Sequence, residues 1–164
     1  MKRFLCFLLV IASLCCIPAC QNNISYRDDL SIASLMESVR GGLNHQMQYS
    51  RADADYHNEY FTMPDFVKER DVYFSTEGNN LNEFGIFRVT EGNAEAMATH
   101  LKEYLSSSLE KNRDFYASYI PEEVEKLRDA EVKQFGNYVA YAILDRSSRN
   151  RFFSSLENGL RKKK

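Results

Sequence analysis

The stretch EVKQFGNYVAYAILD, residues 131–145, decides the fold that we expect for this chain. Gly136 and Asn137 separate two segments that carry β-branched and aromatic residues, which favour strands. Glycine readily adopts the positive φ that a two-residue type II′ turn needs at its first position. The stretch therefore predicts a β-hairpin, with Val132 in one arm and residues 138–144 in the other.

Two further strands are expected upstream of this hairpin. The segment DFVKERDVYFST, residues 65–76, contains a Val-Tyr-Phe run, and EFGIFRVT follows at residues 83–90. Alternate residues of a strand point to opposite faces, so Phe84 and Ile86 share one face and Phe87 lies on the other. Apolar residues on both faces predict that 83–90 is an interior strand, covered on two sides.

Apolar residues recur at helical spacing in four segments. Asn93 is the expected N-cap of the longest helix, and the Ser147-Ser148 pair is the expected cap of the last one. Gly41 marks the expected end of the first helix, and Pro121 the start of the third. The expected helices cover about residues 28–40, 94–119, 121–130 and 149–160.

The order helix, strand, strand, long helix, hairpin, helix predicts an α+β fold, with an antiparallel sheet of about four strands and helices packed on it. The chain has 164 residues, 21 basic and 23 acidic side chains and a net charge of −2, which excludes a charge-based binder of nucleic acid. Its 10 tyrosines and its lack of tryptophan suit many half-buried positions, where the ring packs and the hydroxyl reaches water, and they equally suit a carbohydrate or peptide groove.

Three features carry a resemblance to a known family: EFGIF at 83–87, the long helix after it, and YIPEEVEKLRDAEVKQFGNYVAYAILD at 119–145. Together they resemble the domain-of-unknown-function 4358 family of small lipoproteins of Gram-positive type, over about residues 30–145. The resemblance implies a lipoprotein signal peptide at 1–19, a lipidated tether at 20–27 and an α+β domain at 28–145. It implies no activity, cofactor or catalytic residue, and the helix after Asp145 lies beyond the family core.

The N-terminal residues predict a secretory signal peptide. Lys2 and Arg3 precede an apolar run from Phe4 to Ile17 that only Ser13 interrupts. This run is shorter than the roughly 20 residues that a membrane-spanning helix needs, so we expect the segment to be cleaved.

The cleavage site determines where the protein resides. Ile17-Pro18-Ala19-Cys20 resembles a bacterial lipobox, although Pro18 departs from the small or branched residue usual there. The resemblance implies cleavage between Ala19 and Cys20 and a diacylglycerol thioether on Cys20, which anchors the protein to the cell membrane outside the cytoplasm. The alternative is an ordinary signal peptide cut near Ala19, which leaves Cys20 as a free thiol. Because no cysteine follows Cys20, a disulfide framework is excluded for the mature chain.

The C-terminal region, residues 146–164, joins an amphipathic helix to a basic tail, GLRKKK. Two interpretations stay open. The helix, with Phe152 and Phe153, can pack on the sheet and leave the tail in solvent, or it can touch anionic lipid or a wall polymer.

Residues 44–64 show no clear period, but DADYHNE within them holds the best candidates for a metal site. Asp53, Asp55, His57 and Glu59 offer the oxygen and nitrogen ligands that Zn²⁺ or Mn²⁺ accepts. In an extended segment all four project on one face, whereas in a helix only Asp53 and His57 align. A solvated acidic face is the other interpretation.

The sequence lacks a recognisable catalytic constellation: it has three histidines and no Gly-x-Ser-x-Gly turn or glycine-rich phosphate loop. We therefore expect a lipid-anchored extracytoplasmic module that binds or scaffolds at the cell envelope without a cofactor. Its expected partners are the membrane, through Cys20, and an envelope protein or wall polymer. The alternative is an envelope enzyme or metal-dependent factor that uses residues 53–59.

Overall fold

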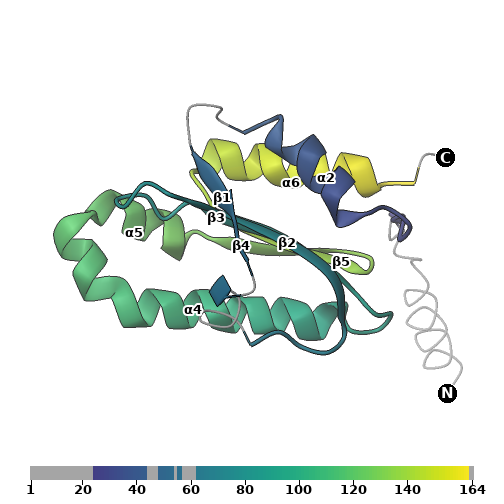
Figure 1. Cartoon of the computed structure of the whole chain (residues 1–164), viewed down its shortest axis with the longest axis horizontal. Coiled ribbons are helices and arrows are strands. Elements are labelled where there is room, and N and C mark those ends of the chain that lie inside the picture. The colour runs from purple at the N-terminus through teal and green to yellow at the C-terminus, as the bar shows by residue number, and fades with distance from the viewer. Residues whose placement is uncertain (1–23, 44–47, 54, 57–61, 163–164) are drawn as a thin grey trace, which may run out of the picture.

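The computed structural model describes residues 24–43, 48–53, 55–56 and 62–162 (Figure 1). It contains one antiparallel sheet in the order β1-β2-β3-β5-β4. The strands are β1 (Tyr49–Arg51), β2 (Val67–Ser75), β3 (Glu83–Val89), β4 (Glu131–Phe135) and β5 (Tyr138–Ile143). The α+β prediction is confirmed, and the sheet has one strand more than the four expected.

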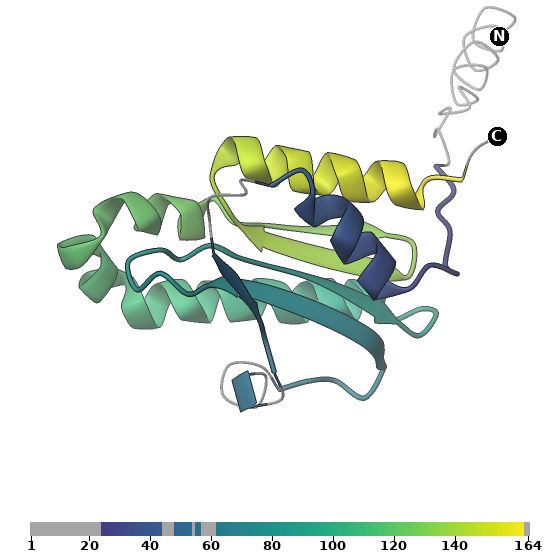
Figure 2. The ribbon, with the colours of Figure 1, turned by 45° about the horizontal axis from the view of Figure 1, so that its top comes forward.

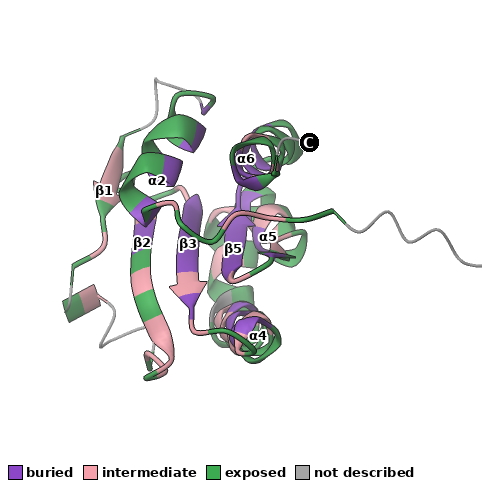
Figure 3. Ribbon diagram, turned by 90° about the vertical axis from the view of Figure 1, so that its right-hand side faces the viewer, coloured by how far each residue is buried: buried purple, intermediate pink, exposed green. Residues whose placement is uncertain are grey.

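The additional strand is β1, which pairs with β2 at the edge of the sheet. It has three residues, too few for an alternation of apolar and polar side chains to be visible in the sequence. The other four strands lie where the sequence predicts them, and β3 is the central strand. Both β3 and β5 are almost entirely buried, as their purple colour in Figure 3 shows.

The predicted hairpin turn is also confirmed. Gly136 has a φ of +61°, and Phe135 pairs directly with Tyr138 across the two-residue loop. No described residue other than glycine has a positive φ, so the φ of Asn137 is negative. A type II′ turn has a negative φ at this second central position, whereas a type I′ turn has a positive one, so the turn is of type II′.

Helices cover both faces of the sheet (Figures 1 and 2). On one face lie α2 (Ile32–Arg40) and α6 (Arg146–Leu160), and on the other lies α4 (Ala94–Tyr119), which is followed by α5 (Pro121–Arg128). Asn93 is the N-cap residue of α4, as predicted, but its side chain makes no capping hydrogen bond.

The predicted cap of α6 is wrong by two residues. The N-cap is Asp145, whose carboxylate accepts the backbone N–H groups of Ser147 and Ser148. Partial burial acts to raise the pKa of Asp145, but hydrogen bonds from these two serines outweigh it and lower that pKa to about 2. Asp and Ser both cap helices well, and the sequence pattern alone does not separate them.

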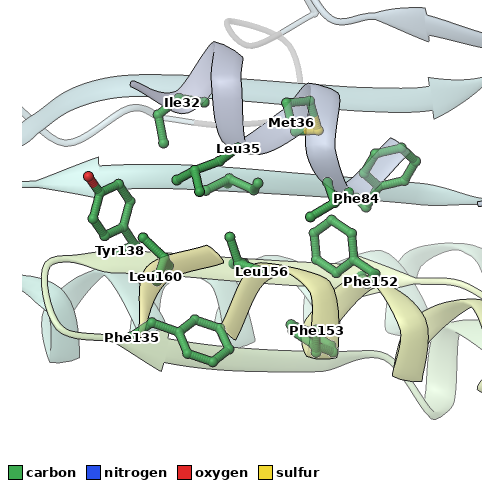
Figure 4. Packing of buried hydrophobic residues seen from close by; sticks show 14 of the residues in the cluster. Ile32, Leu35, Met36, Phe84, Phe135, Tyr138, Phe152, Phe153, Leu156 and Leu160 are labelled. Atoms are coloured by element: carbon green, nitrogen blue, oxygen red, sulfur yellow. The ribbon is translucent and has the colours of Figure 1, made fainter. Parts of the chain in front are cut away.

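The first hydrophobic core lies between the sheet and the α2/α6 pair (Figure 4). Phe84 of β3 and Tyr138 of β5 face this core, and the Tyr138 hydroxyl donates to the Leu30 carbonyl at 2.7 Å. Phe152 and Phe153 are 0% and 3% exposed, so α6 packs on the sheet and does not present these rings to solvent. The helical members of this core are Ile32, Leu35, Met36, Val39, Phe152, Phe153, Leu156 and Leu160.

The second core lies between the opposite sheet face and α4. Phe87 of β3 and Tyr141 of β5 face it, together with Met97 and Leu101 of α4. Leu127 of α5 closes this core at the end of the sheet where β3 begins.

The two ends of the described chain meet at the other end of the sheet. Tyr26 and Arg161 form an antiparallel bridge, and the Arg27 N–H donates to the Leu160 carbonyl at 2.8 Å. The segment before α2 therefore lies on the far side of the molecule from the β2–β3 loop and α5 (Figures 1 and 2). Within the described residues, no helix combines the length and the apolar character needed to cross a bilayer.

Candidate functional site

The most unusual group in the structure is the carboxyl of Glu83, the first residue of β3. Its side chain lies on the face of the sheet that α4 covers, and Glu83 is only 7% exposed. None of the described lysines, arginines or histidines forms an ion pair with it. A buried carboxylate needs other compensation for its lost hydration.

Three tyrosine hydroxyls supply that compensation. Tyr104 of α4 and Tyr141 of β5 donate to Glu83 Oε1, the first at 2.9 Å, and Tyr56 donates to Oε2. We refer to Glu83, Tyr56, Tyr104 and Tyr141 as the tyrosine–glutamate cluster. The cluster joins β3 to three other parts of the chain, and hydrogen bonds to an ionised carboxylate are stronger than those between neutral groups.

The strand register places Tyr141 in this cluster. Tyr141 lies directly opposite Gly85 in the β3–β5 pair, and Glu83 precedes Gly85 by two residues on the same face. A Cβ at Gly85 would lie 2.7 Å from Tyr141 Cε1 and 2.8 Å from Val72 Cγ2. The missing side chain of Gly85 therefore leaves the space in which the Tyr141 ring lies.

The electrostatics of the cluster depend on how deeply it is buried. Burial raises the pKa of the Glu83 carboxyl above its ordinary value of 4.5, and the hydrogen bonds from Tyr141, Tyr56 and Tyr104 oppose this shift without cancelling it. Burial and the charge of Glu83 also raise the pKa of Tyr104 and of Tyr141. The tyrosines consequently remain protonated hydrogen-bond donors at physiological pH.

A cavity of about 330 Å³ opens beside the cluster, between the end of the sheet, α4 and α5. The Tyr56 and Phe74 rings stack in its wall, with centroids 4.6 Å apart and an interplanar angle of 9°. Tyr116 of α4 adds a third aromatic ring. The remaining lining residues are Ser75, Asn80, Leu81, Asn82, Tyr104, Ser108, Leu127 and Ile143.

A second polar network holds the β2–β3 loop in place at this cavity. The Leu81 N–H donates to Glu123 Oε2 at 2.9 Å, and Glu123 pairs with Lys126 at 2.5 Å. Lys126 Nζ also donates to Asn82 Oδ1 at 3.2 Å, and Asn82 in turn donates to the Tyr49 hydroxyl. The loop is therefore tied to α5 on one side and to β1 on the other.

The residues that we predicted as metal ligands do not assemble a site in the described part of the chain. Asp53 is exposed and accepts the backbone N–H of Tyr56 at 2.9 Å, and Asp55 is also exposed. His57 and Glu59 lie outside the described residues, as do Ala19 and Cys20. Among the described residues, no group of three His, Cys, Asp or Glu side chains is arranged to hold a metal ion.

Comparison with protein families gives a match over the region that holds the tyrosine–glutamate cluster. The family model described as "Domain of unknown function (DUF4358)" matches residues 43–144. The chain belongs to this family. The matched region begins later than the residue 30 that the sequence suggested, and it ends immediately before α6, as expected. It includes the whole tyrosine–glutamate cluster and Gly85. No curated protein and no solved structure matches the chain.

The buried carboxyl gives a prediction about pH. Because the pKa of Glu83 is raised on folding, its contribution to stability is complete below about pH 4.5 and is lost as pH rises through the folded-state pKa. Glu83→Gln removes this titration. The free energy of unfolding of the variant, minus that of the wild type, should increase with pH by up to about 1.4 kcal/mol per pH unit.

Urea denaturation followed by circular dichroism between pH 4.5 and 8 measures this difference. Glu103→Gln on the exposed side of α4 removes the same charge and is the control, which should follow the wild type. If the free energies of unfolding of Glu83→Gln and the wild type change in parallel with pH, the pKa of Glu83 is the same in the folded and unfolded states, which contradicts the prediction.

Proposed function

We propose that the protein is a lipid-anchored extracytoplasmic module that binds a small ligand in the cavity beside Glu83 and does not catalyse a reaction. The observation that carries this proposal is a cavity that ends on a buried carboxyl without a basic partner among the described residues. Cavities with largely apolar walls and a few convergent polar groups are the usual places for ligands in proteins. Carboxylates are rarely buried without a basic partner, and carboxyl groups with a shifted pKa are concentrated at functional sites.

Binding is favoured over catalysis by the composition of the cavity. Of the described residues that line it, none is Cys, His, Lys or Arg. A serine nucleophile needs an adjacent base, usually a histidine, to activate it. Ser75 and Ser108 line the cavity, and none of the described lining residues is a histidine.

The anchoring part of the proposal rests on Cys20 and on the shape of the fold. A tether attached before residue 24 reaches the domain where Tyr26 pairs with Arg161. The cavity lies at the opposite end of the sheet, beside α5 and the β2–β3 loop (Figure 1). Two acyl chains on Cys20 would hold the protein firmly on the membrane and leave the cavity end accessible from the envelope.

A photo-crosslinking experiment in intact cells tests both parts. The full-length chain carries p-benzoylphenylalanine in place of Tyr116, which lines the cavity, or in place of Glu103, which is exposed on the same helix. We expect a defined mass adduct at position 116 and none at position 103. Cys20→Ala should abolish the incorporation of labelled fatty acid into the protein. Equal crosslinking at both positions would contradict the binding site, and unchanged incorporation of labelled fatty acid into Cys20→Ala would contradict the lipid anchor.

A further inference from the structure

We infer that the ligand of the Glu83 cavity carries an organic primary ammonium group on a short aliphatic stem. This inference rests on the proposed function and specifies the chemical class that the cavity recognises. A free amine and the amino end of a larger envelope molecule share this chemistry.

The first argument is the charge of the cavity. Among the described lining residues, Glu83 is the one acidic residue and none is basic. The acidic groups of the neighbouring network do not add an uncompensated charge, because Glu123 is paired with Lys126 at 2.5 Å. A cation that enters the cavity therefore meets a carboxyl in a medium of low dielectric constant, where their attraction is much stronger than in water.

The second argument is the hydrogen bonding of Glu83. Among the described residues, Oε1 accepts from two hydroxyls, those of Tyr104 and Tyr141, whereas Oε2 accepts from one, that of Tyr56. Each carboxylate oxygen can accept about two hydrogen bonds. One acceptor position on Oε2 is therefore available, and an ammonium N–H is the donor that also balances the charge.

The third argument is the aromatic wall. Tyr56 and Phe74 stack in parallel, and Tyr116 of α4 lines the same cavity. Aromatic faces attract cations and also pack against methylene groups. The cavity volume of about 330 Å³ lies at the small end of the range for ligand sites, which fits an alkylammonium stem.

The inference is tested with four probes of known charge: n-butylammonium, the ε-ammonium of Nα-acetyl-lysine methylamide, neutral n-butanol and anionic n-pentanoate. Binding to the folded domain is measured by NMR titration and by the melting temperature. We expect n-butylammonium to bind and to raise the melting temperature by several degrees at saturating concentration. Its affinity should fall as the pH is lowered, because a protonated Glu83 no longer attracts a cation.

Two variants locate the binding. Glu83→Gln should weaken the affinity for n-butylammonium at least about tenfold, since it removes the charged acceptor. Tyr116→Ala, on a half-exposed position of α4, should weaken it several-fold in a domain that stays folded. Tyr119→Ala is the matched control, because Tyr119 is 73% exposed and does not line the cavity.

The outcomes separate this inference from the proposed function. Binding of both ammonium probes supports an amine recognised at the end of a larger molecule, and binding of n-butylammonium alone supports a free small amine. If n-butanol or n-pentanoate binds as tightly as n-butylammonium, and this binding depends on Glu83, the ammonium inference is overturned but the cavity is still a binding site. If none of the four probes binds, the ammonium inference is overturned, and the crosslinking at position 116 alone decides the binding function.

Discussion

A fragment that consists only of residues 43–144 is expected to be unfolded, although it contains the whole region matched by the family. It lacks α2 and α6, which together cover one face of the sheet. Without them, Phe84, Ile86 and Tyr138 would be exposed to water on a continuous apolar surface. The family region therefore contains the candidate site but only part of the core that holds it together.

The magnitude follows from what the two helices bury. Burying a large apolar side chain stabilises a fold by roughly 1.5–3 kcal/mol, and the net stability of a domain is only about 5–15 kcal/mol. The contribution of α2 and α6 is comparable with or larger than this net stability. The side chains that they bury to 0–3% exposure are Ile32, Leu35, Met36, Val39, Phe152, Phe153, Leu156 and Leu160.

Circular dichroism and the dispersion of amide signals in NMR spectra distinguish the two outcomes. The control is the fragment 24–162, which spans the described residues and should unfold cooperatively in urea. A fragment 43–144 that shows dispersed signals and a cooperative transition would contradict the prediction. It would mean that one covered face is sufficient for folding.

The sequence predicts most elements of the fold because each has a local signal. Strand β3 carries apolar residues on both faces, and Gly136 provides the positive φ of the hairpin. Strand β1 is missed because three residues contain no period, and the pairing partner in β2 decides whether it forms. The sequence predicts the cap of α6 at Ser147 and not at Asp145, because Asp145 comes soon after an apolar strand and could equally belong to the end of that strand.

The candidate site is missed for a different reason. Glu83 follows the polar loop EGNNLN, so its sequence context is that of a solvated residue at the start of a strand. Its three partners, Tyr56, Tyr104 and Tyr141, lie 21 to 58 residues away along the chain. The only local sign is Gly85, two residues after Glu83 in an otherwise bulky strand, because a glycine there often marks the close approach of another group.

Gly85→Ala is expected to destabilise the domain by about 2–3 kcal/mol, the cost of adding a methyl group where a close-packed core has no room. The new Cβ would lie 2.7 Å from Tyr141 Cε1 and 2.8 Å from Val72 Cγ2, both in the second core. The Tyr141 ring packs against Phe87 and Tyr104 and would have to shift, and we expect this shift to disturb its hydrogen bond to Glu83. The midpoint of urea denaturation should fall without a change in its slope.

A double-mutant cycle shows whether the effect passes through Tyr141. In a Tyr141→Leu background the ring is absent, so Gly85→Ala should cost less than in the wild type, with the remainder due to Val72 and Phe87. Gly78→Ala is the control for loss of a glycine, because no atom lies within 4 Å of the Cβ that it would add. Equal costs in the two backgrounds would contradict the role given to Gly85. A coupling of the expected sign would show that the missing side chain of Gly85 allows the Tyr141 hydroxyl to reach Glu83. Tyr141 is one of the three donors that compensate the buried carboxylate for its lost hydration.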